Sequence, residues 1–472
     1  MQKGKKTELL KIILPYLLVA GFVLFKVRDL FLPYFWDEAW SYIPAIRKMA
    51  SVGPSLMPNA ISPELYRGHP LLFYFLSSLW IKVFGSNIWV TKLFSLLTSI
   101  GLLLSVYSFS KKNFDYFTAI FTLILLMIQS VFFAQSTFLL PEILLALFTV
   151  LSLQSYLDKK RFLTILWLTL ALYTKESAII IWTTILFFEL IETIKIKNKS
   201  YILRFINLLY FTLPLILITV FFIAQKIIVG WYFFPEHISH FSFGAFFDRL
   251  NGYLSYLFIF IGRNMLTIFG LVALVLLIIR KESILIEKKK VLLILSFYII
   301  SYLLFSSLNF YSPRYLLSIM PFTVLIWVYF IKSTIKYHVA FPVLLLVIVI
   351  LNNLHFTINK RSGHDHTLGY RDLIHVQTKM ISYCENEGIY NREIYTRFLM
   401  LHNLTNKDLG YLNKDSIFFN VRNNLTSKTE FAIVCSNELN KFFYDNLRKK
   451  GVLIKRYEKN GCWTELYQMR NN

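Results

Sequence analysis

The sequence predicts an α-helical protein that crosses a membrane about eleven times and ends in a small α/β domain. First, 56% of its 472 residues are hydrophobic and only 16% are charged, which is more apolar surface than a soluble domain can bury. Second, apolar runs close to the length of a membrane span, about 20 residues, alternate with short basic segments. Third, charge rises and the apolar runs shorten to strand length after about residue 357.

The net charge of +23 would suggest a nucleic-acid partner in a soluble protein. Here many Lys and Arg residues separate apolar runs, as the positive-inside rule expects, so the charge indicates a membrane and not nucleic acid. The three cysteines, Cys384, Cys435 and Cys462, form no C-x-x-C pair or Cys/His cluster, which argues against structural zinc. One disulfide between two of them remains possible if this region lies outside the cytoplasm.

The first span is expected at residues 9–32, after a basic N-terminus. That beginning resembles a signal peptide, but no small-x-small cleavage site follows, so we expect an uncleaved span. Its basic start belongs in the cytoplasm, which places residue 37 on the outer face. Residues 38–50 have the helical spacing of an interfacial helix. The run 70–85 is too short to span and is expected in the outer leaflet.

The later spans are expected near residues 87–109, 115–134, the run ending at Asp158, 206–228, 256–279, 291–307, 315–331 and 338–355. Residues 162–192 are interrupted by Lys175 and Glu176. One interpretation is a single long helix with a buried Lys–Glu pair. The basic residues that follow must return to the inside, which favours two short spans with a hairpin at Lys175.

Eleven spans divide the chain into a membrane domain, residues 1–356, and a domain outside the cytoplasm, residues 357–472. Within the second, strands are predicted at 394–396 and 431–434, a helix at 438–450 that Gly451 ends, and a hairpin of 452–457 with 462–467.

This topology gathers unusual polar groups on the outer face. Asp37 and Glu38 lie among aromatics where a carboxylate in hydrocarbon is costly, so they are expected to face a site, although they could simply begin a surface helix. The others are Arg67, His69, Glu142, Lys175, Glu176, His237, His240 and Arg314. Each alone could be an interface anchor, a helix cap or a snorkelling side chain. Together, acids that accept a proton and cations that hold phosphate suit sugar transfer from a lipid-phosphate carrier.

Several motifs in order resemble the protein O-mannosyltransferase superfamily of GT-C glycosyltransferases, which includes the bacterial lipid A aminoarabinose transferases. They are the acidic pair Asp37-Glu38, the segment His69-Pro70-Leu71-Leu72-Phe73-Tyr74, Glu142 after Pro141, the turn Tyr173-Thr174-Lys175, and Arg314-Tyr315-Leu316-Leu317 through Pro321. The segment from Tyr232 to Ile238 looks most like the aminoarabinose branch. The resemblance covers roughly residues 10–330.

The resemblance implies a GT-C fold in the inner (plasma) membrane, with the N-terminus in the cytoplasm and the C-terminal domain outside. It implies inverting transfer from a polyprenyl-phosphate sugar donor to an extracytoplasmic lipid, glycan or protein. Asp37 would be the general base, and Glu38 and Glu142 would shape the catalytic site. Lys175, Arg314 and Arg67 would bind the donor phosphate, and His69, Tyr74 and His240 would contact substrate.

No cofactor is certain from this resemblance, although the aminoarabinose branch can hold a divalent metal ion. His237 matches one ligand of that metal, whereas Gly68 occupies the position of another and Glu64 lies close by. Two other function classes stay open. A transporter or lipid flippase also buries charge, but should show repeats, and none is visible. A sensor or scaffold would leave Asp37 dispensable.

Overall fold

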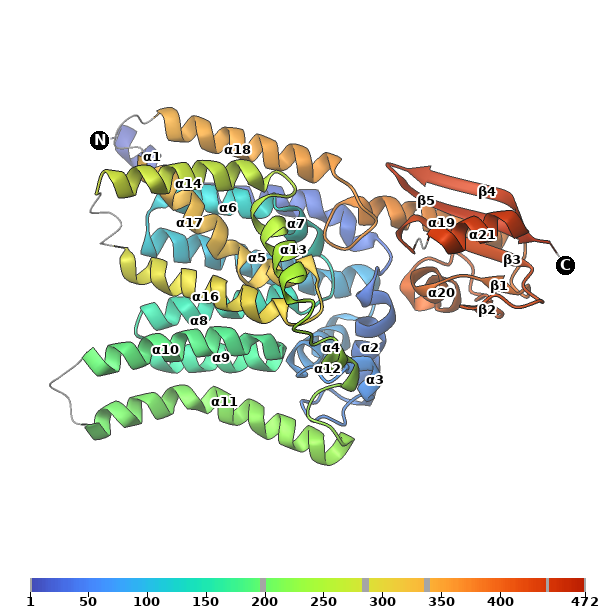
Figure 1. The fold of residues 1–472 in the computed structure, drawn as a ribbon, viewed down its shortest axis with the longest axis horizontal. Coiled ribbons are helices and arrows are strands. Elements are labelled where there is room, and N and C mark those ends of the chain that lie inside the picture. The colour runs from blue at the N-terminus through green and yellow to red at the C-terminus, as the bar shows by residue number, and fades with distance from the viewer. Residues whose placement is uncertain (1, 196–200, 282–287, 335–339, 439–440, 471–472) are drawn as a thin grey trace.

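The computed structural model describes residues 2–195, 201–281, 288–334, 340–438 and 441–470. A bundle of roughly parallel helices makes up most of the protein, and a small sheet with its helices lies beyond one end of the bundle (Figure 1). The predicted fold class, a helical polytopic bundle with a C-terminal α/β part, is confirmed.

The helices of the bundle have apolar sequences in common. They are α1 (Gln2–Lys26), α5 (Ile88–Asn113), α6 (Tyr116–Met127), α8 (Glu142–Leu157), α9 (Arg161–Thr174), α10 (Ile179–Lys195), α11 (Tyr201–Val229), α14 (Arg263–Ile279), α16 (Lys289–Ser307), α17 (Met320–Ser333) and α18 (Ala340–Asn359). Shorter segments connect them: η1 (Val27–Phe31), η2 (Glu38–Tyr42), α2 (Ile43–Val52), α3 (Pro63–Tyr66), α4 (Leu72–Phe84), α7 (Ser130–Gln135), η3 (Glu176–Ala178), α12 (Pro235–Ser239), α13 (Phe246–Phe258) and η4 (Pro313–Ser318).

Length and composition identify the candidate membrane spans. Six of the described helices are long and apolar enough to cross a membrane, and the bent pair α13–α14 would make a seventh. The predicted spans at α6, α8, α9 and α17 are apolar helices of 12 to 16 residues, so each rises only about 18–24 Å. The hairpin at Lys175 is present, because α9 ends at Thr174 and α10 begins at Ile179.

The structure corrects the eighth span, which is not one helix over 256–279. Helices α13 and α14 meet at 83°, and Ile261 and Gly262 between them have φ of 56° and 77°. The break frees the carbonyl of Gly262, which accepts hydrogen bonds from Asn352 and Asn353 Nδ2 at 2.8 and 3.2 Å. Irregular backbone inside a membrane protein is tolerated where other helices satisfy it in this way. The predicted third span is also interrupted, between α6 and α7.

The C-terminal part is a five-stranded sheet with strand order β2-β1-β3-β5-β4. Its elements are α19 (Gly369–Asn386), β1 (Ile394–Tyr395), α20 (Phe398–Thr405), η6 (Lys407–Leu409), β2 (Val421–Arg422), β3 (Phe431–Cys435), η7 (Ser436–Glu438), α21 (Lys441–Lys450), β4 (Gly451–Lys459) and β5 (Cys462–Met469). The predicted hairpin is β4–β5, which closes with Lys459 opposite Cys462. The three cysteines are buried and form no disulfide. The first residues of the helix predicted at 438–450, and the basic residues 196–200, lie outside the described ranges.

Contacts between the sheet region and the bundle fix the loop that carries Asp37. The amide of Tyr34 donates to the carbonyl of Leu409 at 3.0 Å, and Arg47 pairs with Asp408 at 2.6 Å. Gly410 packs against Ile88 of α5, so closely that an added Cβ at Gly410 would be 2.4 Å from the Ile88 side chain. Residues more than 300 positions apart therefore define one end of the bundle together.

Candidate active site

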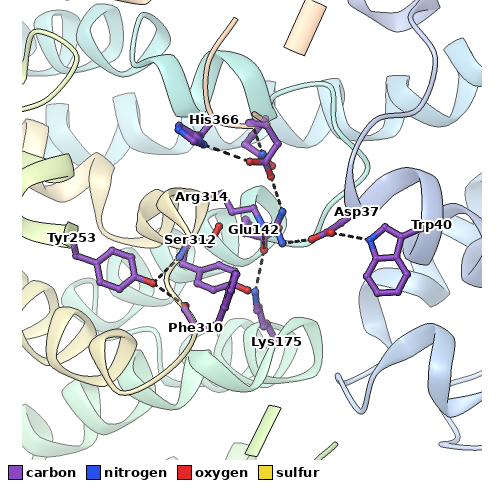
Figure 2. Close-up of polar contacts among 12 residues, drawn as sticks. Asp37, Trp40, Glu142, Lys175, Tyr253, Phe310, Ser312, Arg314 and His366 are labelled. Atoms are coloured by element: carbon purple, nitrogen blue, oxygen red, sulfur yellow. Dashed lines mark hydrogen bonds and ion pairs between the residues drawn. The ribbon is translucent and has the colours of Figure 1, made fainter. Parts of the chain in front are cut away.

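Arg314 is the centre of the candidate site. It lies in η4, 7% exposed, and its guanidinium donates to Asp37 Oδ2 and, at 2.6 Å, to Asp365 Oδ2. Its Nε lies 3.4 Å from Glu142 Oε1. Figure 2 shows Arg314 between Asp37 and Glu142. The planar guanidinium can engage several carboxylates at once, which a lysine cannot do in the same way.

The network continues from Glu142 to Lys175. Lys175 Nζ donates to Glu142 Oε1 at 3.0 Å and lies 4.1 Å from the ring centre of Tyr315. Glu142 is 3% exposed at the start of α8. Its Oε2 makes no hydrogen bond. Lys175, Glu142, Arg314 and Asp37 therefore form one continuous chain of charges, which the sequence predicted only as neighbours on one face.

The local backbone explains how Asp37 reaches this network. Trp36 has a left-handed φ of 55°, which turns the chain between the extended segment before it and η2. The side chain of Asp37 then accepts from Trp40 Nε1 at 3.0 Å through Oδ1, while Oδ2 faces Arg314. Such strain in a bulky residue persists only where surrounding contacts enforce it, and the rings of Phe35, His364 and Phe398 lie within 5.8 Å of Trp36.

Two adjoining cavities meet at this network. The larger, about 1120 Å³, has Asp37, Arg67 and Arg314 in its wall. The smaller, about 410 Å³, contains Lys175 together with many aromatic side chains. Residues shared by both walls are His237, His240, Phe310 and Tyr315. Asp37 and Arg314 thus line the larger cavity and Lys175 the smaller one, whereas Glu142, which contacts both cations, lines neither.

Glu38 does not join these groups. It is completely buried, and Lys92 Nζ lies 3.3 Å from Oε2. Its carboxylate also accepts from the amides of Phe35 at 3.0 Å and Leu139 at 2.7 Å. These contacts hold the 33–37 loop against α7–α8, and Glu38 lines neither cavity. The expectation that Glu38 shapes the catalytic site finds no support in this placement.

The predicted histidines and Arg67 also line the cavities: Arg67 the larger one, His69 the smaller one, and His237 and His240 both. His69 Nδ1 is 3.0 Å from Glu176 Oε2, and its ring is 4.9 Å from that of His237. Arg67 pairs with Glu236 and lies 4.8 Å over the ring of Trp40. His240 lines both cavities, with its ring 5.4 Å from Phe310.

Tyr74 does not reach either cavity. It is buried and stacks on Tyr42 with ring centres 5.4 Å apart, and it is absent from both walls. This stacking packs η2, which ends at Tyr42, against α4, which carries Tyr74.

Asp365 was not predicted and completes the network. It lies in the segment between α18 and α19, where burial opposes its ionisation, but Arg314 and His366 hold the pKa of Asp365 well below its usual range. The polar run Gly363-His364-Asp365-His366 directly after the last apolar span was the available signal. Nothing in the sequence indicates that this run folds back onto Arg314.

The residues near His237 do not fit the expected metal ion. In the described ranges no group of three or more His, Cys, Asp or Glu side chains is arranged to hold a metal. Glu176 is already engaged by His69, and Gly68, at the position of the second expected ligand, has no side chain to offer a metal.

Comparison with known proteins is consistent with this geometry. The family model described as dolichyl-phosphate-mannose-protein mannosyltransferase matches residues 68–222. An ArnT from Cupriavidus metallidurans bound to undecaprenyl phosphate superposes over 98% of both chains with a TM-score of 0.55 and 13% identity.

This chain has the GT-C glycosyltransferase fold. The apo form of the same ArnT agrees, with a TM-score of 0.53, 13% identity, and coverage of 96% of this chain and 97% of that chain. The apo oligosaccharyltransferase of Archaeoglobus fulgidus has a TM-score of 0.52 and 10% identity, over 98% of this chain and 74% of that chain. The resemblance inferred from the motifs is therefore confirmed. No curated protein sequence matches the chain.

Proposed function

We propose that the protein is an integral-membrane glycosyltransferase that moves a sugar from a polyprenyl-phosphate carrier to an acceptor outside the cytoplasm. The observation that carries the proposal is the continuous network from Asp37 through Arg314 and Glu142 to Lys175 at the junction of two cavities. The family match and the GT-C fold support the reaction class. The undecaprenyl phosphate in the ArnT structure supports the donor class.

The two cavities suggest how the substrates divide. The smaller cavity combines aromatic side chains with Lys175, which suits an isoprenoid chain ending in a phosphate. The larger cavity contains Asp37 and opens beside α13, α18 and the C-terminal region, which leaves room for an acceptor hydroxyl. The anomeric carbon would then lie between Asp37 and Lys175, where the cavities meet.

In the proposed step, the acceptor oxygen forms a bond to the anomeric carbon as the bond from that carbon to the phosphate oxygen breaks. The electron pair of the broken bond stays on the phosphate, and Lys175 and Arg314 stabilise its added charge. The hydroxyl proton passes to Asp37. Attack opposite the leaving group inverts the anomeric centre.

Arg314 has a further part in this proposal. In the structure it already pairs with Asp37, so Asp37 Oδ2 is occupied before any substrate arrives. An arriving donor phosphate competes for the same guanidinium. Binding of the donor would therefore loosen Asp37 from Arg314 and make it available to the acceptor.

Asp37→Asn tests the function in membranes supplied with radiolabelled polyprenyl-phosphate sugar. Loss of a positioned general base lowers a rate by about 10²–10⁴-fold, so we expect near-abolished transfer at normal expression. Asp415→Asn, which removes an exposed carboxylate of the C-terminal part, is the matched control and should retain activity. Full transfer by Asp37→Asn would exclude the proposed mechanism, and a transporter or flippase would show no transfer in the native protein either.

A further inference from the structure

A third cavity, of about 900 Å³, lies where the end of α1 and η1 meet α19. It shares no lining residue with the two cavities of the candidate active site. In Figure 1 the end of α1 runs toward the C-terminal region, where α19 lies. The proposed transfer reaction makes no use of this cavity.

The polar end of this cavity is basic. Its wall contains Arg28, Arg371 and Lys459 with one carboxylate, Asp29. Asp29 is already occupied, because Lys26 pairs with it from inside the protein and Tyr370 donates to it at 2.7 Å. The three cations of the wall therefore exceed the negative charge available to them.

Two of these cations have unused binding capacity. Arg28 is exposed, and no acidic side chain pairs with it within the described part of the chain. Arg371 donates one guanidinium nitrogen to Asp29 at 2.6 Å, but its buried Nε has no hydrogen-bond partner. A buried donor without a partner is destabilising, so an acceptor at this position would be favoured.

The electrostatic environment agrees with an anion site. Burial, and then the positive charges of Lys459 and Lys379, lower the pKa of the neighbouring His375. Lys459 is itself only loosely paired, 3.7 Å from Asp372. The local potential at the cavity mouth is therefore positive.

The other end of the cavity is apolar and belongs to the membrane. Leu24 and Phe25 line it, and each is 75% exposed. Both lie in the candidate span Glu8–Phe31, so their exposed surfaces face hydrocarbon chains. Arg28 and Asp29 follow within one turn, which puts the charges at the level where lipid headgroups begin.

We propose that this cavity binds an anionic phospholipid. The phosphate would contact Arg28, Arg371 and Lys459, and an acyl chain would lie along Leu24 and Phe25. Guanidinium groups match phosphate oxygens in bidentate geometry, and basic pockets beside spanning helices are suited to anionic headgroups. A soluble anion would leave the apolar half unused, and a zwitterionic lipid would leave the excess positive charge uncompensated.

Such a lipid would join the two parts of the molecule. Arg28 is in η1, at the end of the candidate span Glu8–Phe31, whereas Arg371 and Lys459 are on α19 and β4. A phosphate between them adds to the Asp29–Arg371 ion pair that already crosses this junction. Bound lipid would therefore raise the thermal stability of the whole chain, independently of any transfer activity.

The test uses the purified full-length protein with phosphatidylglycerol or phosphatidylcholine of identical acyl chains. Retained lipid is measured by native mass spectrometry, and Tm is measured with and without each lipid. We expect retention of phosphatidylglycerol over phosphatidylcholine and a rise in Tm only with phosphatidylglycerol. Arg28→Glu should weaken phosphatidylglycerol binding roughly tenfold, and adding Lys459→Glu should weaken it further.

Lys48→Glu is the matched control, because Lys48 is an exposed cation on α2 that lines none of the three cavities. It should change phosphatidylglycerol binding less than twofold. Since Arg28 is exposed and pairs with no acidic side chain of the described residues, Arg28→Glu should keep the lipid-free Tm of the native protein. Equal retention of both lipids, or equal effects of Arg28→Glu and Lys48→Glu, would overturn the proposal. Displacement of phosphatidylglycerol by millimolar inorganic phosphate would instead identify a soluble-anion site and also overturn it.

Discussion

Lys175 has a structural role in a buried ion pair and a proposed chemical role in binding the donor phosphate. Comparing variants with and without its partner Glu142 can separate the two. The Lys175 side chain is 9% exposed, and its Nζ lies 3.0 Å from Glu142 Oε1, whose own side chain is 3% exposed. Removing one member of a buried ion pair leaves an uncompensated charge and costs about 3–5 kcal/mol. Arg314 Nε, at 3.4 Å and without a hydrogen bond to Glu142, offsets only part of this loss. We therefore expect Lys175→Gln to lower the Tm of the purified protein clearly.

The double variant Lys175→Gln with Glu142→Gln removes both charges and should recover most of the lost Tm, because two amides of nearly unchanged size can hydrogen-bond to each other. Transfer should not recover with it. Loss of a phosphate-binding lysine should leave the rate at least tenfold low at saturating acceptor, with a raised apparent KM for the donor.

Thermal unfolding followed by intrinsic fluorescence and the radiolabelled transfer assay measure the two effects on the same preparations. The coupling free energy from the double-mutant cycle gives the strength of the pair. A single variant with native Tm would show that the pair does not stabilise the fold. A stable double variant with native rate and donor KM would show that Lys175 has no part in using the donor.

The remaining predictions concern groups beside the site. Glu38→Gln leaves buried Lys92 without its counter-charge, so it should reduce the free energy of unfolding by about 3–5 kcal/mol and lower the Tm. Transfer per folded molecule should stay within a few-fold of native. Native stability with abolished transfer would instead make Glu38 a catalytic group. Burial and the nearby His69 lower the pKa of His237 from 6.5 to about 3. Between these two pH values the unfolded chain binds more protons than the folded one, so stability should decrease as pH falls below about 6.5. His237→Gln should make the dependence of Tm on pH shallower between pH 6.5 and 4, and an unchanged slope would contradict the assignment.

Hydrophobic patterning was sufficient to locate nearly every long helix. Apolar runs bounded by basic residues placed the helices now seen as α1, α5, α10, α11, α16 and α18, because hydrocarbon thickness imposes a length on them. The hairpin at Lys175 was predicted from the same pattern, because the basic residues after it must return to the cytoplasmic side. The strands β1, β3, β4 and β5 were visible as short apolar runs bounded by turn residues.

Within the site, the sequence determined the chemical types that were available. Asp37, Glu142, Lys175 and Arg314 stood out because charge is costly beside a membrane, and the structure brings all four into one network. Which carboxylate meets which cation was decided by tertiary packing. Adjacent residues 37 and 38 look equivalent in sequence, yet one lines the large cavity and the other pairs with Lys92 in the core.

The contacts that only the tertiary structure reveals join residues far apart in the sequence. Asp365 reaches Arg314 across 51 residues, and Arg371 reaches Asp29 across 342. No local pattern encodes such pairs, because they depend on how helices cross and where the C-terminal part docks. The break at Gly262 has the same origin, since the side chains that satisfy its carbonyl come from α18. The apolar length that a bilayer requires can be read from the order of residues in the sequence. The pairing of buried charges depends on how the helices pack, so only the tertiary structure determines it.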